Sequence, residues 1–272
     1  ILVCLVGSEM CIRDRSNKRG WYGAYAQAGA AVGVILANLA FLAVSTSISD
    51  QAFLDWGWRL PFIASIVLIG ISLYVQLRME DTEAFKALKA SQAAAGEQVA
   101  VPKSPVIEAI RRYPRRIMLA AGAFLSVQVT FYILIAFVIA YGLNSPSVEL
   151  TRDEMLTSVL IAAAAMIPAL FYFSGMSDRV GRKQIYRWGA ILTGAWGFAL
   201  FPLIDTGSPL MITLAVSVGM IFLGMQYGPQ AAYFTELFST EVRYSGASLG
   251  YQIGAILGGA LAPIIAVLLW TE

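Results

Sequence analysis

Long apolar stretches alternate with short polar connections along most of the 272-residue chain. A run of about 20 apolar residues is long enough to cross the hydrocarbon core of a bilayer as a helix. Runs of this length cover roughly residues 20–46, 59–78, 115–142, 153–176, 183–204, 208–235 and 244–270. None carries a charge well inside, as expected where a central Arg, Lys or Asp costs about 2.5–3.5 kcal/mol on insertion. The pattern predicts an all-α integral membrane protein with seven spans.

Composition supports this interpretation. Hydrophobic residues make up 58% of the chain and charged residues 13%, about half the charged fraction of an ordinary soluble domain. The alternative, buried core helices of a large soluble protein, would require far more polar sequence elsewhere. Histidine is absent and two cysteines occur, which argues against a zinc cluster or a disulfide framework. We expect no metal and no cofactor.

Basic residues are distributed unevenly over the connections between the spans. If alternate connections share a side of the membrane, all 19 Lys and Arg residues except Arg59 and Arg152 lie on one side. An excess of basic residues marks the cytoplasmic side. The central connection and the turn around Gly181 are therefore predicted to face the cytoplasm.

The chain divides after the second span. Residues 79–103 form a long polar connection, so we expect two spans in 16–78, a cytoplasmic linker in 79–114 and five spans in 115–272. The first fifteen residues, ILVCLVGSEMCIRDR, do not fit this pattern. They resemble the translated sequencing-adaptor sequence seen at the ends of predicted environmental proteins, and we expect them to lie outside the fold. A genuine tail of a preceding span is the alternative.

Local signals mark the starts of three helices. The sequence TRDE at 151–154 predicts a capping box at the start of the fourth span. Ser208 before Pro209 predicts a capping serine followed by a proline in the first turn of the sixth span. Ser104 before Pro105 predicts the same for a short helix in the linker.

An internal repeat connects the first span with the seventh. QAGAAVG at 27–33 and QIGAILG at 252–258 share the pattern Q-x-G-A-x-x-G. The two copies lie six spans apart in helices of the same direction, as parallel six-helix repeats require. Glycines of these helices form small-xxx-small faces for close packing, namely Gly29, Gly33, Gly250, Gly254 and Gly258. Packing without a role in transport is the alternative interpretation, and the two are compatible.

A highly charged turn separates the fourth span from the fifth. Within FYFSGMSDRVGRKQIYRWGA at 171–190, the segment SGMSDRVGRKQ resembles the cytoplasmic loop signature of the major facilitator superfamily, G-x-x-x-D-R-x-G-R-K/R. The matching positions are Gly175, Asp178, Arg179, Gly181, Arg182 and Lys183.

Other segments extend this resemblance to nearly everything after residue 16. Residues 17–33 and 56–62 are similar to the fifth helix and the start of the sixth in the superfamily's metabolite:proton symporters. Residues 225–263 are similar to their tenth and eleventh helices. The resemblance implies a transporter fragment that holds helices 5–11 of twelve, with helices 1–4 and 12 missing.

The resemblance also implies a function. It points to a secondary transporter in a bacterial inner membrane that moves a small organic solute, a carboxylate or a compatible solute, together with protons. We expect the solute, protons and the lipid bilayer as partners, no nucleic acid, and a monomer. Sugar porters share the loop signature and are an alternative, although EDTEAF at 80–85 is closer to the symporters.

The charged turn suggests a latch. Gly181 can take a positive φ in a tight reversal. Asp178 is a lone carboxylate among cations, and we expect it to accept hydrogen bonds at the positive N-terminal end of a neighbouring helix. The pseudo-symmetry of the superfamily that the chain resembles implies that this neighbour is the first span, near residues 20–21. Asp178 would also pair with Arg182 or Arg19 and so close the cytoplasmic side. A solvated turn, in which exposed ion pairs contribute about 0–1 kcal/mol, is the alternative.

Two further charges flank the last cytoplasmic loop. Glu236 and Arg243 lie at the ends of neighbouring spans, and we expect them to form a related cluster. Arg187, by contrast, is expected to be a solvated residue of the positive side.

Few polar side chains lie well inside the spans. Amides and phenols hydrogen-bond a polar or anionic solute without carrying a fixed charge, and the candidates for the substrate cavity are Gln27, Gln128, Tyr132, Gln226, Tyr227 and Gln230. Interhelical hydrogen bonds, worth about 0.6 kcal/mol each, are the alternative.

Residues and motifs that the sequence lacks limit the possible sources of energy for transport. No carboxylate or histidine lies in the middle of a span, so a proton-coupling group is expected in helices 1–4. No glycine loop of the ATP-binding type occurs, which leaves an ion gradient. A membrane enzyme would need clustered catalytic groups, and a channel fits the repeat and the gate-like turn poorly. A truncated chain that transports nothing by itself stays a possibility.

Overall fold

In the computed structural model, the structure describes residues 18–78, 105–145, 148, 150–238 and 242–271. The first fifteen residues and the linker up to residue 104 lie outside the described residues. The described part contains seven helical segments that are long and apolar enough to cross a membrane, which confirms the predicted number of spans. They are Arg19–Ser47, Gly57–Tyr74, Pro114–Asn144, Arg152–Val180, Arg182–Ile204, Pro209–Glu236 and Tyr244–Trp270.

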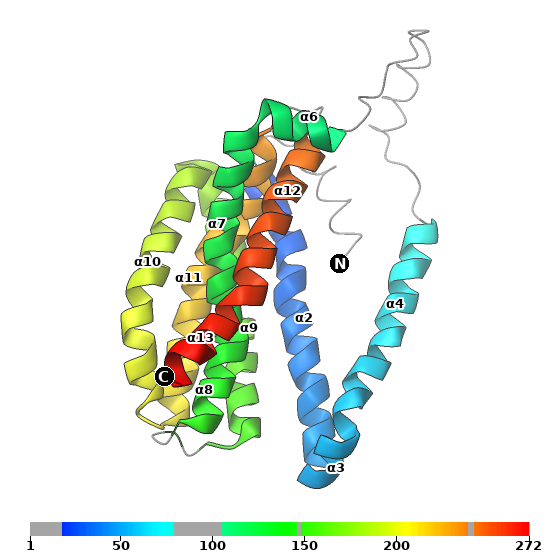
Figure 1. Ribbon diagram of the computed structural model, residues 1–272, viewed down its shortest axis with the longest axis vertical. Coiled ribbons are helices and arrows are strands. Elements are labelled where there is room, and N and C mark those ends of the chain that lie inside the picture. The colour runs from blue at the N-terminus through cyan, green and yellow to red at the C-terminus, as the bar shows by residue number, and fades with distance from the viewer. Residues whose placement is uncertain (1–17, 79–104, 146–147, 149, 239–241, 272) are drawn as a thin grey trace.

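The first two spans form a hairpin with open arms. Helix α2 (Arg19–Ser47) leads through the short helix α3 (Asp50–Asp55) and the turn η2 (Gly57–Arg59) to α4 (Leu60–Arg78). Figure 1 shows α2 next to the other spans, while α4 diverges from them. Apolar side chains of α4 such as Ile66 and Val67 are exposed. Such a surface suits lipid or further membrane helices.

The other spans form a bundle that begins after the short helix α6 (Pro105–Arg112). The third span consists of α7 (Pro114–Tyr132), the π-helical turn η3 (Ile133–Phe137) and α8 (Val138–Asn144). Three continuous helices follow, α9 (Arg152–Val180), α10 (Arg182–Ile204) and α11 (Pro209–Glu236). The seventh span consists of α12 (Arg243–Ala255), the π-helical turn η4 (Ile256–Ala260) and α13 (Leu261–Thr271).

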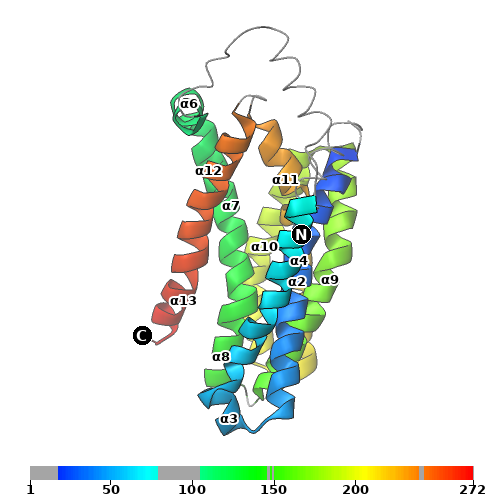
Figure 2. The ribbon, with the colours of Figure 1, turned by 90° about the vertical axis from the view of Figure 1, so that its right-hand side faces the viewer.

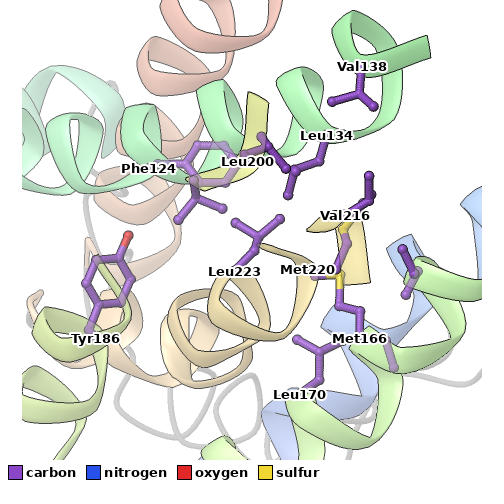
Figure 3. Packing of buried hydrophobic residues seen from close by; sticks show 14 of the residues in the cluster. Phe124, Leu134, Val138, Met166, Leu170, Tyr186, Leu200, Val216, Met220 and Leu223 are labelled. Carbon is purple, nitrogen blue, oxygen red and sulfur yellow. The ribbon is translucent and has the colours of Figure 1, made fainter. Parts of the chain in front are cut away.

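Helix α11 lies at the centre of the packing. It contacts α9, α10 and α2, whereas α12 packs mainly on α7. Buried side chains of α11 such as Val216, Met220 and Leu223 meet Leu134 of η3 and Met166 of α9 (Figure 3). Because lipid tails are as apolar as these side chains, van der Waals packing rather than the hydrophobic effect holds the helices together.

The predicted helix starts have mixed outcomes. The capping box is confirmed: the Thr151 hydroxyl accepts a hydrogen bond from the Glu154 backbone N–H (3.3 Å), and the Glu154 carboxylate accepts one from the Thr151 N–H (2.8 Å). Pro209 begins α11 and Ser208 is its N-cap residue, as predicted, but the Ser208 side chain makes no capping hydrogen bond. The Ser208 N–H donates to the Thr206 hydroxyl (3.4 Å).

The turn between α9 and α10 has the predicted backbone. Gly181 has a φ of 104° and is the residue that separates the two helices. A side chain is strained at such an angle, whereas glycine is not. The tight reversal places the start of α10 directly beside the end of α9.

Candidate functional site

Asp178, near the end of α9, contacts the start of α2. Its carboxylate oxygens accept hydrogen bonds from the backbone N–H groups of Gly20 (2.8 Å) and Trp21 (3.0 Å). Both groups belong to the first turn of α2, where N–H groups have no acceptor within the helix and the helix dipole favours an anion. The Asp178 side chain is 6% exposed, so water screens the contact little. The contact lies where the sequence predicted it.

Small residues allow this close crossing of α2 and α9, which run side by side (Figure 2). A Cβ atom at Gly20 would lie 2.7 Å from the Ser174 carbonyl oxygen and 2.9 Å from the Asp178 carboxylate. A Cβ atom at Gly175 would lie 3.2 Å from the Trp21 indole ring. Any larger residue at position 20 would push the first turn of α2 away from Asp178.

Arg182 extends the contact to two further helices. Its guanidinium donates to the Asp178 carboxylate at 3.1 Å and to the Glu236 carboxylate at 2.7 Å. The Arg182 side chain is 12% exposed. We call Gly20, Trp21, Asp178, Arg182 and Glu236 the Asp178 cluster, because together they join α2, α9, α10 and α11.

Arg182 connects the two predicted carboxylates. Of the two predicted partners of Asp178, Arg182 makes the ion pair described above. Glu236 pairs with Arg182, because α11 ends beside the start of α10. The Arg243 side chain is not among those that the structure describes. Arg179, Lys183 and Arg187 are exposed.

Sequence reasoning missed a further basic contact at this end. The Arg116 guanidinium of α7 donates to the backbone carbonyl of Leu237, just after α11, at 2.6 Å. A cation is favourable beside the carbonyl groups at a helix end. Arg116 is one of many basic residues near the linker, and its partner is 121 positions away in the sequence.

Helices α2 and α9 also meet at their opposite ends. The Ser45 hydroxyl of α2 donates to the Asp153 carboxylate of α9 at 2.8 Å. Beside it, the Arg152 guanidinium lies 5.2 Å from the ring centroid of Phe53 in α3. We call these four residues the Asp153 contact. Nothing in the sequence pattern pairs them.

Gln226, a predicted cavity residue, is engaged inside the bundle. Its amide oxygen accepts a hydrogen bond from the Ser126 hydroxyl of α7 (3.2 Å), and its amide nitrogen donates to the Thr193 hydroxyl of α10 (2.9 Å). The residue is 1% exposed. In this structure Gln226 therefore joins three helices, which is the arrangement expected of the alternative, an interhelical hydrogen bond.

Two other amides are buried without partners. Neither amide atom of Gln230 has a hydrogen-bond partner among the described residues, nor does the amide nitrogen of Gln27. Gln230 is fully buried and Gln27 is 8% exposed. Since buried polar side-chain atoms are nearly always paired, these amides require a partner that the described residues do not supply.

Gln128 and Tyr132 lie on one face of α7, against the seventh span. A Cβ atom at Gly258 would lie 2.8 Å from the Gln128 Cβ atom, and one at Gly259 would lie 2.9 Å from the Tyr132 ring. Both side chains are half-buried, as is Tyr227 of α11. Gln128 and Tyr132 thus lie against the seventh span, away from the contacts of Gln226 with α10.

The predicted packing glycines behave differently in the two copies of the repeat. In the seventh span, a Cβ atom at Gly250 would lie 2.8 Å from the Ala120 Cβ atom, and one at Gly254 would lie 2.7 Å from the Ala121 carbonyl oxygen. Both glycines thus allow close packing on α7. In the first span Gly29 is half-buried, but a Cβ atom at Gly33 would meet nothing within 4 Å. Gly33 thus has no close helix neighbour within the described part of the chain, and its packing role stays a prediction.

The described residues include no group of three or more His, Cys, Asp or Glu side chains that could hold a metal ion. The Asp178 cluster has two carboxylates, and both are engaged by Arg182. Its arrangement is that of a contact between helices.

Comparison with known proteins identifies relatives along most of the chain. The profile of the Major Facilitator Superfamily matches residues 12–263. The chain is 34% identical over 264 residues to the inner membrane metabolite transport protein YhjE of Escherichia coli (strain K12), covering 94% of this chain and 57% of that protein. It is 32% identical over 256 residues to the shikimate transporter of the same organism, covering 94% and 57%. It is 28% identical over 268 residues to the proline/betaine transporter, covering 96% and 52%.

The chain spans somewhat more than half the length of these curated relatives, all of which are named as transporters. Its seven apolar helices agree with a multi-pass protein of the inner membrane. Together with the match over most of its length, they show that the chain belongs to the Major Facilitator Superfamily.

Proposed function

We propose that the chain forms helices 5–11 of a twelve-helix secondary transporter, which moves a small organic solute across the inner membrane by proton symport with alternating access. The observation that carries this proposal is the contact of Asp178 with the start of α2, because it joins the two halves of such a transporter at one end. Relatives named for transport of metabolites, shikimate and proline or betaine support it.

Contacts at both ends of the α2–α9 interface support alternating access. The Asp178 cluster holds α2 on α9 at one end, and the Asp153 contact holds them at the other. Opening to one side breaks one set of contacts and keeps the other. Each hydrogen bond to a charged group contributes about 1.5–3 kcal/mol, and moving a two-state equilibrium from 1:99 to 99:1 takes about 5.5 kcal/mol. Two such bonds at Asp178 are therefore of the size that a conformational switch needs.

The face of α2 around Gly33 also fits the proposed twelve-helix transporter. Gly33 corresponds to Gly258 in the repeat, and Gly258 packs on α7. If both halves have the same arrangement, the face around Gly33 packs on the first-half equivalent of α7. That equivalent is helix 1 of the complete transporter.

The group that couples transport to protons is also proposed to lie in the first half of the complete transporter. No span contains a carboxylate or a histidine near its middle, so we place the titrating group in helices 1–4. The central linker and the turn at Gly181 face the cytoplasm in this proposal, and the transporter acts as a monomer. Gln27, Gln128, Tyr132, Tyr227 and Gln230 remain the proposed cavity residues.

Uptake by the complete transporter in proteoliposomes tests this function. We expect labelled shikimate, proline or betaine to accumulate when a pH gradient, alkaline inside, is imposed, and a protonophore to abolish the accumulation. A labelled sugar serves as the comparison, because sugar porters share the loop signature. Uptake that persists unchanged after the gradient collapses would overturn proton symport. Failure to transport any of these solutes would overturn the solute class proposed here.

A further inference from the structure

A buried amide marks the place where α2 faces α11. Gln27 is 8% exposed, and its amide nitrogen has no hydrogen-bond partner among the described residues. An unpaired donor at such a depth costs stability. A ligand that accepts hydrogen bonds would satisfy it, and Gln27 lies between the two proposed halves of the transporter, where transporters of this architecture bind their solutes.

Tyr227 lies at the same level as Gln27. Helices α2 and α11 run in opposite directions, and a Cβ atom at Gly23 would lie 3.7 Å from the Ala231 Cβ atom. One turn further along α2 is Gln27, and one turn back along α11 is Tyr227. The two polar side chains therefore lie at the same level of the interface between α2 and α11.

Tyr251 of α12 completes the group. Its ring centroid lies 4.6 Å from that of Phe124 in α7 and 5.0 Å from that of Phe234 in α11. These two rings hold the tyrosine in place, and its hydroxyl lies near both Gln27 and Tyr227. Three helices thus bring an amide and two phenols together.

The chemistry of these groups selects a partner. An amide NH₂ group and two phenol hydroxyls all donate hydrogen bonds. A carboxylate accepts several hydrogen bonds at once, and bonds to an ionised acceptor are stronger than those to a neutral one. No Asp or Glu of the apolar runs lies near the middle of a span to compete for these donors.

We propose that Gln27, Tyr227 and Tyr251 bind the carboxylate group of the transported solute. This proposal rests on the transporter function proposed above and adds the group of the solute that is recognised and a residue, Tyr251, which the sequence pattern did not single out. The aromatic contacts position the Tyr251 ring, and its hydroxyl makes the bond to the solute.

Binding to the purified complete transporter tests the proposal. The ligands are the acid identified by uptake, among shikimate, proline and betaine, and the methyl ester of the same acid, each measured by titration calorimetry. The Tyr251→Phe variant removes one hydroxyl and keeps the ring between its aromatic neighbours. We expect its Kd for the acid to rise about tenfold, as for the loss of one hydrogen bond to a charged group, and its Kd for the ester to change little.

Two further variants sharpen the test. Gln27→Glu places a negative charge beside the carboxylate, and we expect a larger loss of affinity for the acid than with Tyr251→Phe. Tyr172→Phe removes a hydroxyl from a side chain that is 65% exposed on α9 and is expected to leave both affinities unchanged. Thermal unfolding of each variant shows whether it is folded.

The outcomes separate this proposal from the transporter function. Carboxylate recognition by Tyr251 is overturned, while transport stands, if Tyr251→Phe binds the acid as tightly as the unchanged protein does. It is also overturned if the variant loses affinity for the acid and for the ester equally. Uptake of the sugar alone, without any of the acids, also overturns it and leaves a transporter. A complete protein that transports nothing overturns the proposed function itself.

Discussion

Replacing Asp178 with Asn is expected to lower solute uptake by the complete transporter at least about tenfold. The carboxylate accepts hydrogen bonds from two backbone N–H groups of α2 and from Arg182. An asparagine side chain has one acceptor oxygen, and its NH₂ group would face donors. Bonds to a charged acceptor contribute about 1.5–3 kcal/mol each, so the loss of one or two shifts the balance of states by a factor of ten or more.

Arg187→Gln is the matched control, because it removes one charge from the same cytoplasmic end. The Arg187 side chain is exposed, and exposed charges contribute about 0–1 kcal/mol. We expect this variant to transport at nearly the normal rate. Initial uptake rates at equal protein levels in proteoliposomes compare the two variants. Equal losses would show that the turn acts through its overall charge and that Asp178 forms no latch.

Replacing Gly228 with Ala is expected to destabilise the bundle. A Cβ atom at this position would lie 2.6 Å from the Ser174 hydroxyl and 2.7 Å from the Leu170 carbonyl oxygen, a backbone atom of α9. Both separations are shorter than van der Waals contact, and α9 cannot yield without losing its other contacts with α11. Overpacking of this kind costs about 1–3 kcal/mol. Thermal unfolding of the purified protein in detergent should show a lower midpoint.

Gly122→Ala is the control for this prediction. Gly122 lies exposed on α7, and a Cβ atom there would meet nothing within 4 Å. Because alanine favours a helix over glycine by up to about 1 kcal/mol, the midpoint should stay the same or rise. A midpoint as high for Gly228→Ala as for Gly122→Ala would mean that α9 and α11 do not pack as closely as described.

The spans were predictable because bilayer thickness sets their length. All seven predicted runs have counterparts in the structure. The capping box at Thr151 and the positive φ of Gly181 were also predictable, since each depends on a few adjacent residues. The dipole at a helix start indicated the kind of contact that Asp178 makes, and its place followed from the pseudo-symmetry of the superfamily that the sequence resembles.

The remaining contacts depend on how each helix is rotated about its axis, which the sequence does not determine directly. The engagement of Gln226 by Ser126 and Thr193, and the pairing of Glu236 with Arg182, join residues that are 33 to 100 positions apart. Tyr251 was missed because a tyrosine in an apolar run looks like a packing residue. Its position next to Gln252 of the repeat was the available signal.

The account depends on the orientation of the Asp178 latch toward the cytoplasm. Cysteine labelling measures it in the complete transporter, with Cys4 and Cys11 first replaced by Ser. In right-side-out membrane vesicles, a membrane-impermeant maleimide should label Gln51→Cys, in exposed α3 between the first two spans. It should label Lys183→Cys, which is exposed in the charged turn beside Asp178, only after the vesicles have been permeabilised. Labelling of Lys183→Cys in sealed vesicles would contradict the account.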